Sequence, residues 1–542
     1  MARMHRPFSG AVSALALAAA ILTITVHARQ QPTSYEGLLK LFADFVAFER
    51  PVLKNGAPDY GAAAVAARRT TLKTFQSRLA SIDTQGWPVE QQVDHALVRA
   101  MMNGLDFDLR VLRPWARDPA FYKSVWTEQS DTPAHEGPTH HAVVELWTYA
   151  FPLSTADEAR LAAGLRTIPP LLSQARVNLV GNARDLWTTG TGTMAAQIAD
   201  LDALDKTVPA SAAGLKEVIR DARAATAGFV QWLERQAPAK TGPSGVGKEH
   251  YTWSLRNVQL VPMTWDDEVA LLKRELARAH ASLELEEHRN RGLPQLTAAA
   301  NADEYRQRAN AAVAKYMAFL RNKDLLTVQD YLDPALREHL GGFVPMERRN
   351  FFAIASHYEP MTLFAHFYHW FDHAWMKNAP HASPIRRGAT LFNVWSTRAE
   401  GMATAMEELI LHAGYYDDNP RAREIVWIML AQRCARGLAS LYAQANQFDI
   451  KQAKAFQVEW TPRGWMRPDL DLLNFEQQLY LRQPGYGSSY VTGKYLIDEM
   501  IKDRARQLGD AFTMRRFFDE FNAAGVIPLP LVRWQMTGQR GE

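Results

Sequence analysis

Apolar residues recur at helical spacing along most of the chain. The clearest case begins at Thr264, a capping residue that is followed by acidic residues in the first turn. One face of this predicted helix then carries Val269, Leu272, Leu276 and Leu283. Similar stretches occupy residues 36–49, 91–112, 156–178, 211–235, 302–321, 401–413 and 421–445. Alternating runs of polar and apolar residues are scarce, so the sequence predicts a mainly α-helical protein.

The clearest internal boundary is the segment Ala237–Lys248, which is rich in glycine and proline and lacks periodic apolar residues. It divides the chain into an N-terminal helical region over 29–240, a loop over 241–248 and a C-terminal helical region over 249–542. A chain of this length buries a large core. We expect one large, lobed, multi-helix body with a deep central cleft.

The N-terminus has the pattern of a secretory signal peptide. Arg3 and Arg6 precede an apolar run from Ala11 to Val26, and a cleavage site fits after Ala28. An uncleaved anchor is the alternative, although the run is shorter than the usual span of about 20 residues. No cysteine follows the run, which argues against a lipid-modified N-terminus. We expect a periplasmic or secreted protein with signal peptide 1–28 and no membrane span after cleavage.

Composition excludes one class of partner and one source of stability. The net charge is only +3 at pH 7, so nucleic acid is not expected as a partner. Cys434 is the only cysteine, and a single cysteine cannot form an internal disulfide. It lies in an apolar helical stretch, where we expect an inert core residue.

Two glycine-rich or histidine-rich loops carry weaker signals. Gly242–Lys248 fits the phosphate-binding loop except at its last position, where Glu249 replaces the magnesium-binding hydroxyl, and no buried strand precedes it. We interpret it as a linker. The loop 131–139 leads into His140 and His141 and also holds His135. These histidines are candidates to line the cleft, and a solvated loop is the simpler interpretation. A further loop is predicted over Gln483–Ser489.

The strongest chemical signal is the aromatic, histidine-rich segment 361–375. His366, His369 and His373 are spaced i, i+3 and i+7, so on a helix they share one face. Histidines about one turn apart, with a carboxylate from a later helix, are a common way to hold zinc. A buried helix whose histidines bond to backbone or carboxylates is the alternative. Glu400 is the candidate downstream acid.

These and other segments together resemble the bacterial "domain of unknown function 885" family of helical exported proteins that look like zinc metallopeptidases. The matching segments are Gly247–Tyr251, Glu400–Met402 with Glu407, Pro484–Gly485 through Tyr490 to Gly493–Lys494, Leu508–Phe512, Phe517–Asp519 and Gly525–Leu529. Their order and spacing agree with the family pattern. The resemblance implies a metallopeptidase-like fold, a zinc cofactor and a peptide or small-molecule substrate in the cleft.

The departures from the family pattern fall on its chemistry. The family's metal motif is His-Glu-x-x-Pro-Gly-His-His, and here His366 and His373 match its first and last histidines. Phe367 replaces the glutamate, Trp370-Phe371 replaces Pro-Gly, and Asp372 replaces the remaining histidine. Phe518 replaces another histidine, in the family's C-terminal Phe-His-Asp.

Helix geometry bears on which histidines would bind metal. In an unbroken helix, His366 and His373 would lie about 10.5 Å apart along the axis, too far to share one zinc ion. Pro-Gly can break the helix in family members, and Trp-Phe has no such tendency. If the helix continues, His369 and His373 form the natural pair. We therefore predict His369, His373 and Glu400 as zinc ligands, with His366 as the alternative.

Neither choice of histidines supplies the usual general base. Peptide hydrolysis at zinc needs a carboxylate beside the attacking water. Glu359, Asp372, Glu407 and Glu408 are the substitutes that the sequence offers, and we select Glu407. By resemblance, Tyr490 is the expected oxyanion donor, whereas a packed tyrosine beside a glycine-rich turn is the alternative.

Two functions remain after this reasoning. One is an exported zinc peptidase with a divergent active site. The other is a non-catalytic relative that binds peptides or another envelope ligand in the cleft. Phe367, Trp370, Phe371 and Phe518 favour the second, because aromatic side chains there replace polar ones.

Overall fold

The structure is a computed structural model that describes residues 34–132, 137–388 and 396–540. The mainly α-helical fold is confirmed. Within the described residues, strands occur only as two short pairs, antiparallel β1 (Leu53–Lys54) with β2 (Ala57–Pro58) and parallel β3 (Val125–Trp126) with β4 (Val144–Glu145). The predicted signal peptide, His135 and the cleavage site after Ala28 lie outside the described residues.

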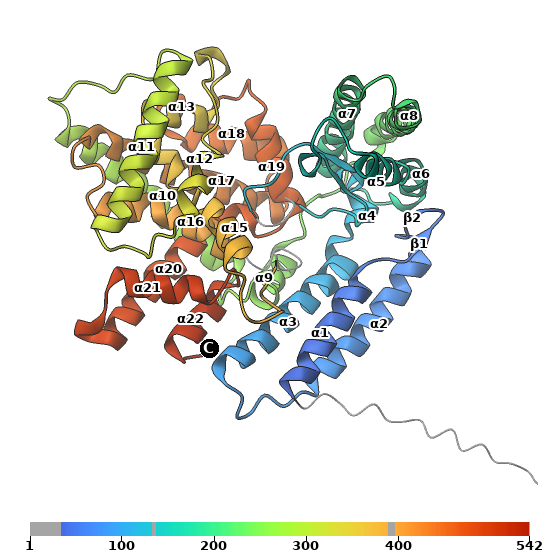
Figure 1. The fold of residues 1–542 in the computed structure, drawn as a ribbon, viewed down its shortest axis with the longest axis horizontal. Coiled ribbons are helices and arrows are strands. Elements are labelled where there is room, and N and C mark those ends of the chain that lie inside the picture. Colours follow the sequence, from blue (N-terminus) through green and yellow to red (C-terminus); the bar gives the residue numbers. More distant parts are fainter. Residues whose placement is uncertain (1–33, 133–136, 389–395, 541–542) are drawn as a thin grey trace, which may run out of the picture.

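The helices of the N-terminal region occupy the right-hand and lower side of the molecule in Figure 1. They are α1 (Tyr35–Glu49), α2 (Ala62–Ala80), α3 (Val89–Phe107), α4 (Pro114–Arg117), α5 (Thr155–Leu165), α6 (Ile168–Asn178), α7 (Arg184–Thr207) and α8 (Ala213–Gln236). A π-helix over Asp108–Leu112 extends α3. The predicted stretch 156–178 is two helices, because Pro169 and Pro170 lack the amide hydrogens that a continuous helix needs.

The C-terminal region holds the remaining α-helices of the described residues. They are α9 (Lys248–Asn257), α10 (Trp265–Arg289), α11 (Ala302–Asn322), α12 (Leu332–Arg337), α13 (Phe351–Tyr358), α14 (Met361–Phe364), α15 (Tyr368–Asn378), α16 (Ser396–His412), α17 (Pro420–Gln444), α18 (Ile450–Trp460), α19 (Leu472–Arg482), α20 (Tyr486–Leu508), α21 (Met514–Ala523) and α22 (Leu529–Thr537). Helix α17 is buried along almost its whole length and packs against α10, α18 and α20. Thr264 and Asp267 form the predicted capping box of α10.

The boundary loop before α9 is hydrogen-bonded to the C-terminal end of α17. Its amides are already used, since Gly245 N donates to Asn446 Oδ1 (2.9 Å), Val246 N to Gln444 Oε1 (3.1 Å) and Gly247 N to Gln444 O (2.8 Å). A phosphate would need those same amides. The loop therefore joins α8 to α9 and anchors both to the end of α17.

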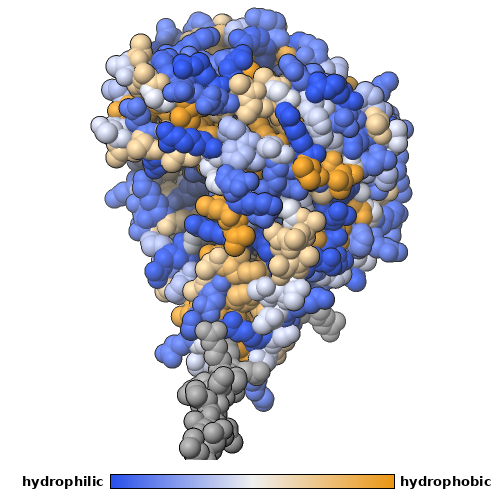
Figure 2. All heavy atoms as spheres, turned by 90° about the vertical axis from the view of Figure 1, so that its right-hand side faces the viewer, coloured by the Kyte–Doolittle hydropathy of each residue, from blue (hydrophilic) through white to orange (hydrophobic). Residues whose placement is uncertain are grey.

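The single cysteine lies where the sequence predicts. Cys434 is buried and unpaired, and burial raises the pKa of its thiol, so it is an inert core residue. The face built from the N-terminal helices is mostly hydrophilic, with hydrophobic groups in small separate patches (Figure 2). No helix in the part of the chain that the structure describes is both long and apolar enough to cross a bilayer.

Two glycines let α16 and α20 cross at backbone contact. A Cβ atom on Gly401 would lie 2.4 Å from Gly493 Cα, and a Cβ atom on Gly493 would lie 2.2 Å from Thr397 O. Both obstacles are backbone atoms, which cannot turn aside as a flexible side chain can. The crossing therefore fixes Glu400, the neighbour of Gly401, against α20.

This crossing should be sensitive to a single methyl group. We expect Gly493→Ala to lower the free energy of unfolding by about 1–3 kcal/mol, because the helices must separate to make room. Gly192→Ala in α7 is the matched control, since a Cβ atom there meets nothing within 4 Å. Gly192→Ala should leave the free energy of unfolding unchanged or raise it, because alanine favours a helix more than glycine does. Urea denaturation measures both, and equal stabilities would contradict the tight crossing.

Candidate metal centre

A break in the histidine-rich segment separates α14 from α15. The turn at 365–367 is held by short-range backbone bonds, His366 N to Leu363 O (2.9 Å) and Phe367 N to Phe364 O (3.1 Å). The break precedes His369 and does not fall at Trp370-Phe371, where family members carry Pro-Gly. A single continuous helix, the condition for pairing His369 with His373, does not form here.

The break brings two histidines together with Glu400. The His366 and His369 rings are nearly perpendicular, with centroids 5.1 Å apart. Glu400 Oε2 lies 3.4 Å from His366 Nε2 and 3.2 Å from His369 Nε2. One ligand atom from each residue lies within 4.8 Å of the other two, and the three residues are 6 %, 0 % and 1 % exposed. Two imidazoles and one carboxylate are a common zinc ligand set.

A second layer of side chains orients these three. Glu407 Oε1 lies 2.9 Å from His366 Nδ1 and accepts a hydrogen bond from Arg433 Nη2 (2.7 Å). Tyr486 donates its hydroxyl proton to Glu400 Oε1. A carboxylate behind a ligating histidine is typical of metal centres, because it fixes the ring and leaves the other nitrogen free.

The electrostatics of the group favour positive charge between the three residues. Burial alone would raise the pKa of Glu400, but His369 and His366 hold that pKa well below its usual range. Burial lowers the pKa of His369, but Glu400, Asp131 and Asp372 together raise it to about 9. His369 Nδ1 makes no hydrogen bond to a described residue. A divalent cation fits this donor set.

His373, which the sequence assigned to the ligands, lies elsewhere. Its Nε2 donates to Asp131 O at 3.1 Å, and its ring stacks on Trp370 with centroids 5.2 Å apart. It lines a cavity of about 650 Å³ between the N-terminal and C-terminal regions, which His141 also lines. The described residues therefore bring together His366, His369 and Glu400, whereas His373 faces the cavity.

The four carboxylates proposed as substitute bases have other partners. Asp372 forms a buried two-bond ion pair with Arg398 (3.0 and 3.1 Å). Glu408 pairs with Arg278 at 2.8 Å, and Glu359 accepts from Asn419 at 2.9 Å. Glu407, our choice from sequence, lies behind His366. Glu407 therefore orients the His366 ring, and none of these four carboxylates is an unpaired general base.

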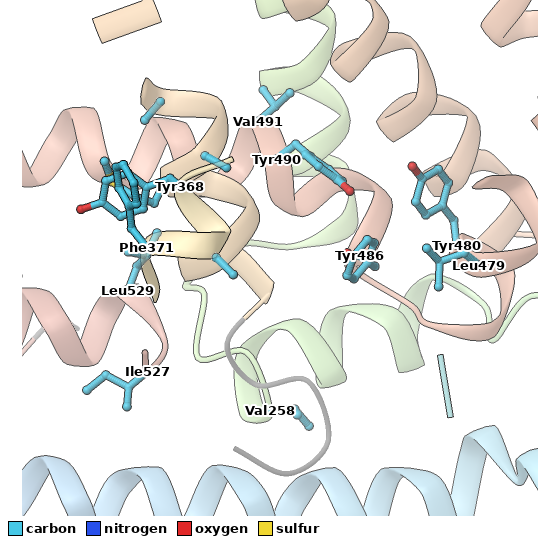
Figure 3. Packing of buried hydrophobic residues seen from close by; sticks show 14 of the residues in the cluster. Val258, Tyr368, Phe371, Leu479, Tyr480, Tyr486, Tyr490, Val491, Ile527 and Leu529 are labelled. Atoms are coloured by element: carbon cyan, nitrogen blue, oxygen red, sulfur yellow. The ribbon is translucent and has the colours of Figure 1, made fainter. Parts of the chain in front are cut away.

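Tyr490 lies directly against the histidines. Its ring stacks on His366 with centroids 5.9 Å apart, and Arg436 covers the ring at 3.6 Å from the centroid. Burial raises the pKa of Tyr490 well above its usual value, so its hydroxyl is a neutral donor. In Figure 3 the Tyr490 side chain points toward Tyr480, and the Tyr486 ring lies near both.

Two participants were missed in the sequence. Tyr486 lies in the predicted loop Gln483–Ser489, yet α20 begins at this residue and the loop ends at Gly485, whose φ of 88° suits glycine. Arg433 looked like an ordinary polar position of a core helix. A signal did exist for it, since a charged residue inside an apolar helical stretch needs a buried partner.

A known family matches the sequence over most of its length. The family model of a bacterial protein of unknown function, DUF885, matches residues 46–341 and 366–536. The chain belongs to the DUF885 family. His366, His369, Glu400 and Glu407 all lie in the second matched segment. No curated protein matches the chain.

Solved structures share the fold of this DUF885 protein. A predicted lipoprotein of unknown function from Shewanella oneidensis is 14% identical, with a TM-score of 0.70 over 93% of this chain and 99% of that one. A predicted lipoprotein from Colwellia psychrerythraea is 11% identical, with a TM-score of 0.65 over the same shares of the two chains. At such identities the likeness concerns the fold alone.

Proposed function

We propose that this protein is a zinc-dependent hydrolase of the cell envelope that acts on peptides, with His366, His369 and Glu400 as metal ligands. The convergence of these three buried side chains carries the proposal. Two imidazoles and one carboxylate that are buried and aimed at one point are the arrangement a zinc ion requires, which favours an ion as its purpose. The metallopeptidase likeness of the family supports the reaction class.

The surrounding residues take roles that follow from their contacts. Zinc in such a site supplies a Lewis acid and a water of lowered pKa. Glu407, held by Arg433, keeps His366 in the orientation that presents Nε2. Tyr486 fixes the Glu400 carboxylate, and Tyr490 offers a neutral donor to developing negative charge.

The envelope location rests on two supports. The N-terminal segment 1–28 has the pattern of a signal peptide, and the two solved structures named above are described as predicted lipoproteins. We propose a periplasmic or secreted protein that is cleaved after Ala28.

A second candidate function is a binding protein without catalysis. Phe367 stands where the family carries its base, and Asp372 and Glu408 are committed to ion pairs. The cavity of about 650 Å³ lies in the range of ligand-binding sites. A family member that keeps the ligand cavity but has lost the general base would have these features.

Metal analysis of purified residues 29–542 distinguishes the two functions. We expect about one zinc per chain in the unaltered protein, and loss of it in His366→Ala and in Glu400→Gln. His373→Ala is the matched control, because its side chain faces the cavity and should leave the zinc in place. Purified protein that contains no zinc after zinc has been supplied would contradict the proposed metal centre. The binding function would then be favoured.

A further inference from the structure

The cavity between the two regions has one wall whose chemistry the metal centre does not use. The N-terminal side contributes Glu49, Tyr60, Asp108, Trp115 and His141, and the C-terminal side contributes His373 among others. His373 follows His369 by one helical turn on α15. A ligand in this cavity would therefore lie beside the element that carries part of the metal centre.

A chain of hydrogen bonds ends on a carboxylate in this wall. The Tyr60 hydroxyl accepts from the backbone N–H of His141 (3.1 Å), so its own proton is directed to His141 Nδ1 (3.0 Å). His141 Nε2–H then donates to Glu49 Oε2 at 2.6 Å. The chain fixes the Glu49 carboxylate and satisfies only one of its two oxygens.

Asp108 is the unusual member of the wall. It begins the π-helix that follows α3, and π-bulges are frequent at functional sites. Its carboxyl makes no hydrogen bond or ion pair with any described residue, although it lines the cavity. Burial and the nearby Glu49 raise the pKa of Asp108 to about 8, against the opposing effect of Arg68. The protein thus keeps a destabilised carboxyl in this cavity.

Aromatic residues line the same cavity as these two carboxyls. The Tyr60 ring centroid lies 4.9 Å from that of Phe121 and 6.2 Å from that of Trp115, and all three residues line the cavity. The faces of aromatic rings attract cations, and carboxylates attract them more strongly. The combination is typical of sites for an ammonium group.

Three arginines, Arg50, Arg68 and Arg482, line the same cavity. Arg482 donates to Asp118 Oδ2 (2.6 Å) and to Pro138 O (2.7 Å). Arg68 donates to the backbone carbonyl of Glu49, and Arg50 is exposed. None of them forms an ion pair with Asp108.

We infer that this cavity binds the ammonium group of a peptide, held by Asp108 and Glu49 and covered by the rings of Tyr60 and Trp115. The inference deepens the proposed function by stating what the substrate carries, and it rests on that function in taking the ligand to be a peptide. The ammonium group can be the N-terminus or a lysine side chain, which share the same chemistry.

Calorimetry on the Glu400→Gln variant tests binding apart from hydrolysis. The probes are tetra-alanine amide, the same amide with its N-terminus acetylated, and N-acetylated amides with one lysine or with norleucine in its place. We expect at least one ammonium-bearing probe to bind about tenfold or more tightly than its neutral counterpart. Tetra-alanine amide would identify the N-terminus and the lysine peptide the side chain. Equal affinity for charged and neutral probes would overturn the inference.

A matched pair of variants tests the carboxyl itself. Asp108→Asn should remove most of the preference for ammonium probes, whereas Asp106→Asn should keep it, because Asp106 pairs with Arg110 (3.1 Å) outside the cavity. At pH 7 a carboxyl with a pKa of about 8 is mostly protonated, so binding should release about one proton, and affinity should rise toward pH 8. Calorimetry in two buffers of different ionisation enthalpy measures that release. Unchanged preference in Asp108→Asn, with an unchanged melting temperature, would refute the site.

Failure of this inference and failure of the proposed function give different results. A zinc-free protein that still prefers ammonium probes would be a peptide-binding protein. A protein that contains zinc but binds charged and neutral probes equally would support the metal centre. It would contradict the binding of an ammonium group.

Discussion

Replacing Asp372 by asparagine is expected to lower the free energy of unfolding by about 3–5 kcal/mol. Asp372 and Arg398 are 1 % exposed each and joined by two hydrogen bonds, so the change leaves a buried guanidinium without its countercharge. The Arg398 guanidinium also lies 4.3 Å from the Phe521 ring centroid, on the side of an apolar ring that cannot replace the carboxylate. Urea denaturation would measure the loss.

Two further variants show whether the ion pair is the cause. The double variant Asp372→Asn, Arg398→Met should recover much of the stability, because no unpaired charge stays buried. Asp418→Asn, which breaks the exposed pair with Lys315, should change stability little. A single Asp372→Asn variant as stable as the unaltered protein would mean that the pair does not hold α15 to α16.

Phe367→Glu is expected to raise chelator-sensitive peptide hydrolysis by about 10²–10⁴-fold, the usual contribution of a general base. This position follows His366 directly and carries glutamate in the family motif that the sequence resembles. The Phe367 ring packs on Phe364, with centroids 5.4 Å apart, so the change also removes an apolar contact. Fluorogenic peptide libraries with and without chelator would measure the gain.

The size of the gain must be separated from the effects of polarity and folding. Phe367→Gln has nearly the same shape as Phe367→Glu but cannot take a proton at neutral pH. Phe367→Glu in the Glu400→Gln background keeps the base and removes a proposed ligand. Equal rates for Phe367→Glu and Phe367→Gln, at equal zinc content, would argue that the centre does not hydrolyse peptides.

Most of the helices could be predicted because their signals are local. Thr264 caps α10 as expected, since a capping box needs only neighbouring residues. The start of α20 at Tyr486 could not be read in this way. Gly485, Gly487 and two serines look like a loop, yet Gly487 lies where a Cβ atom would meet Ser440 Cβ at 2.6 Å. Glycine there serves close packing, which only the tertiary structure reveals.

The ligand set shows the same limit. Glu400 and the histidine segment were found from sequence, because residue type and spacing indicate chemistry. The choice between His366 and His373 depended on where the helix breaks, and the break at 365–367 contains neither proline nor glycine. Tertiary contacts, such as the Asp131 carbonyl that accepts from His373, decide such a break. Spacing along one helix could not supply that information.

The depth of the candidate centre also has a kinetic meaning. His369 is 0 % exposed and Glu400 1 %, so an ion among them could enter or leave only when the surrounding helices separate. Openings of buried helices are rare and slow beside side-chain motion. The residence time of a bound ion would then follow the rate of local opening, and its intrinsic affinity would matter less. Loading would be easiest while the chain folds, and removal of the ion would need prolonged incubation with chelator.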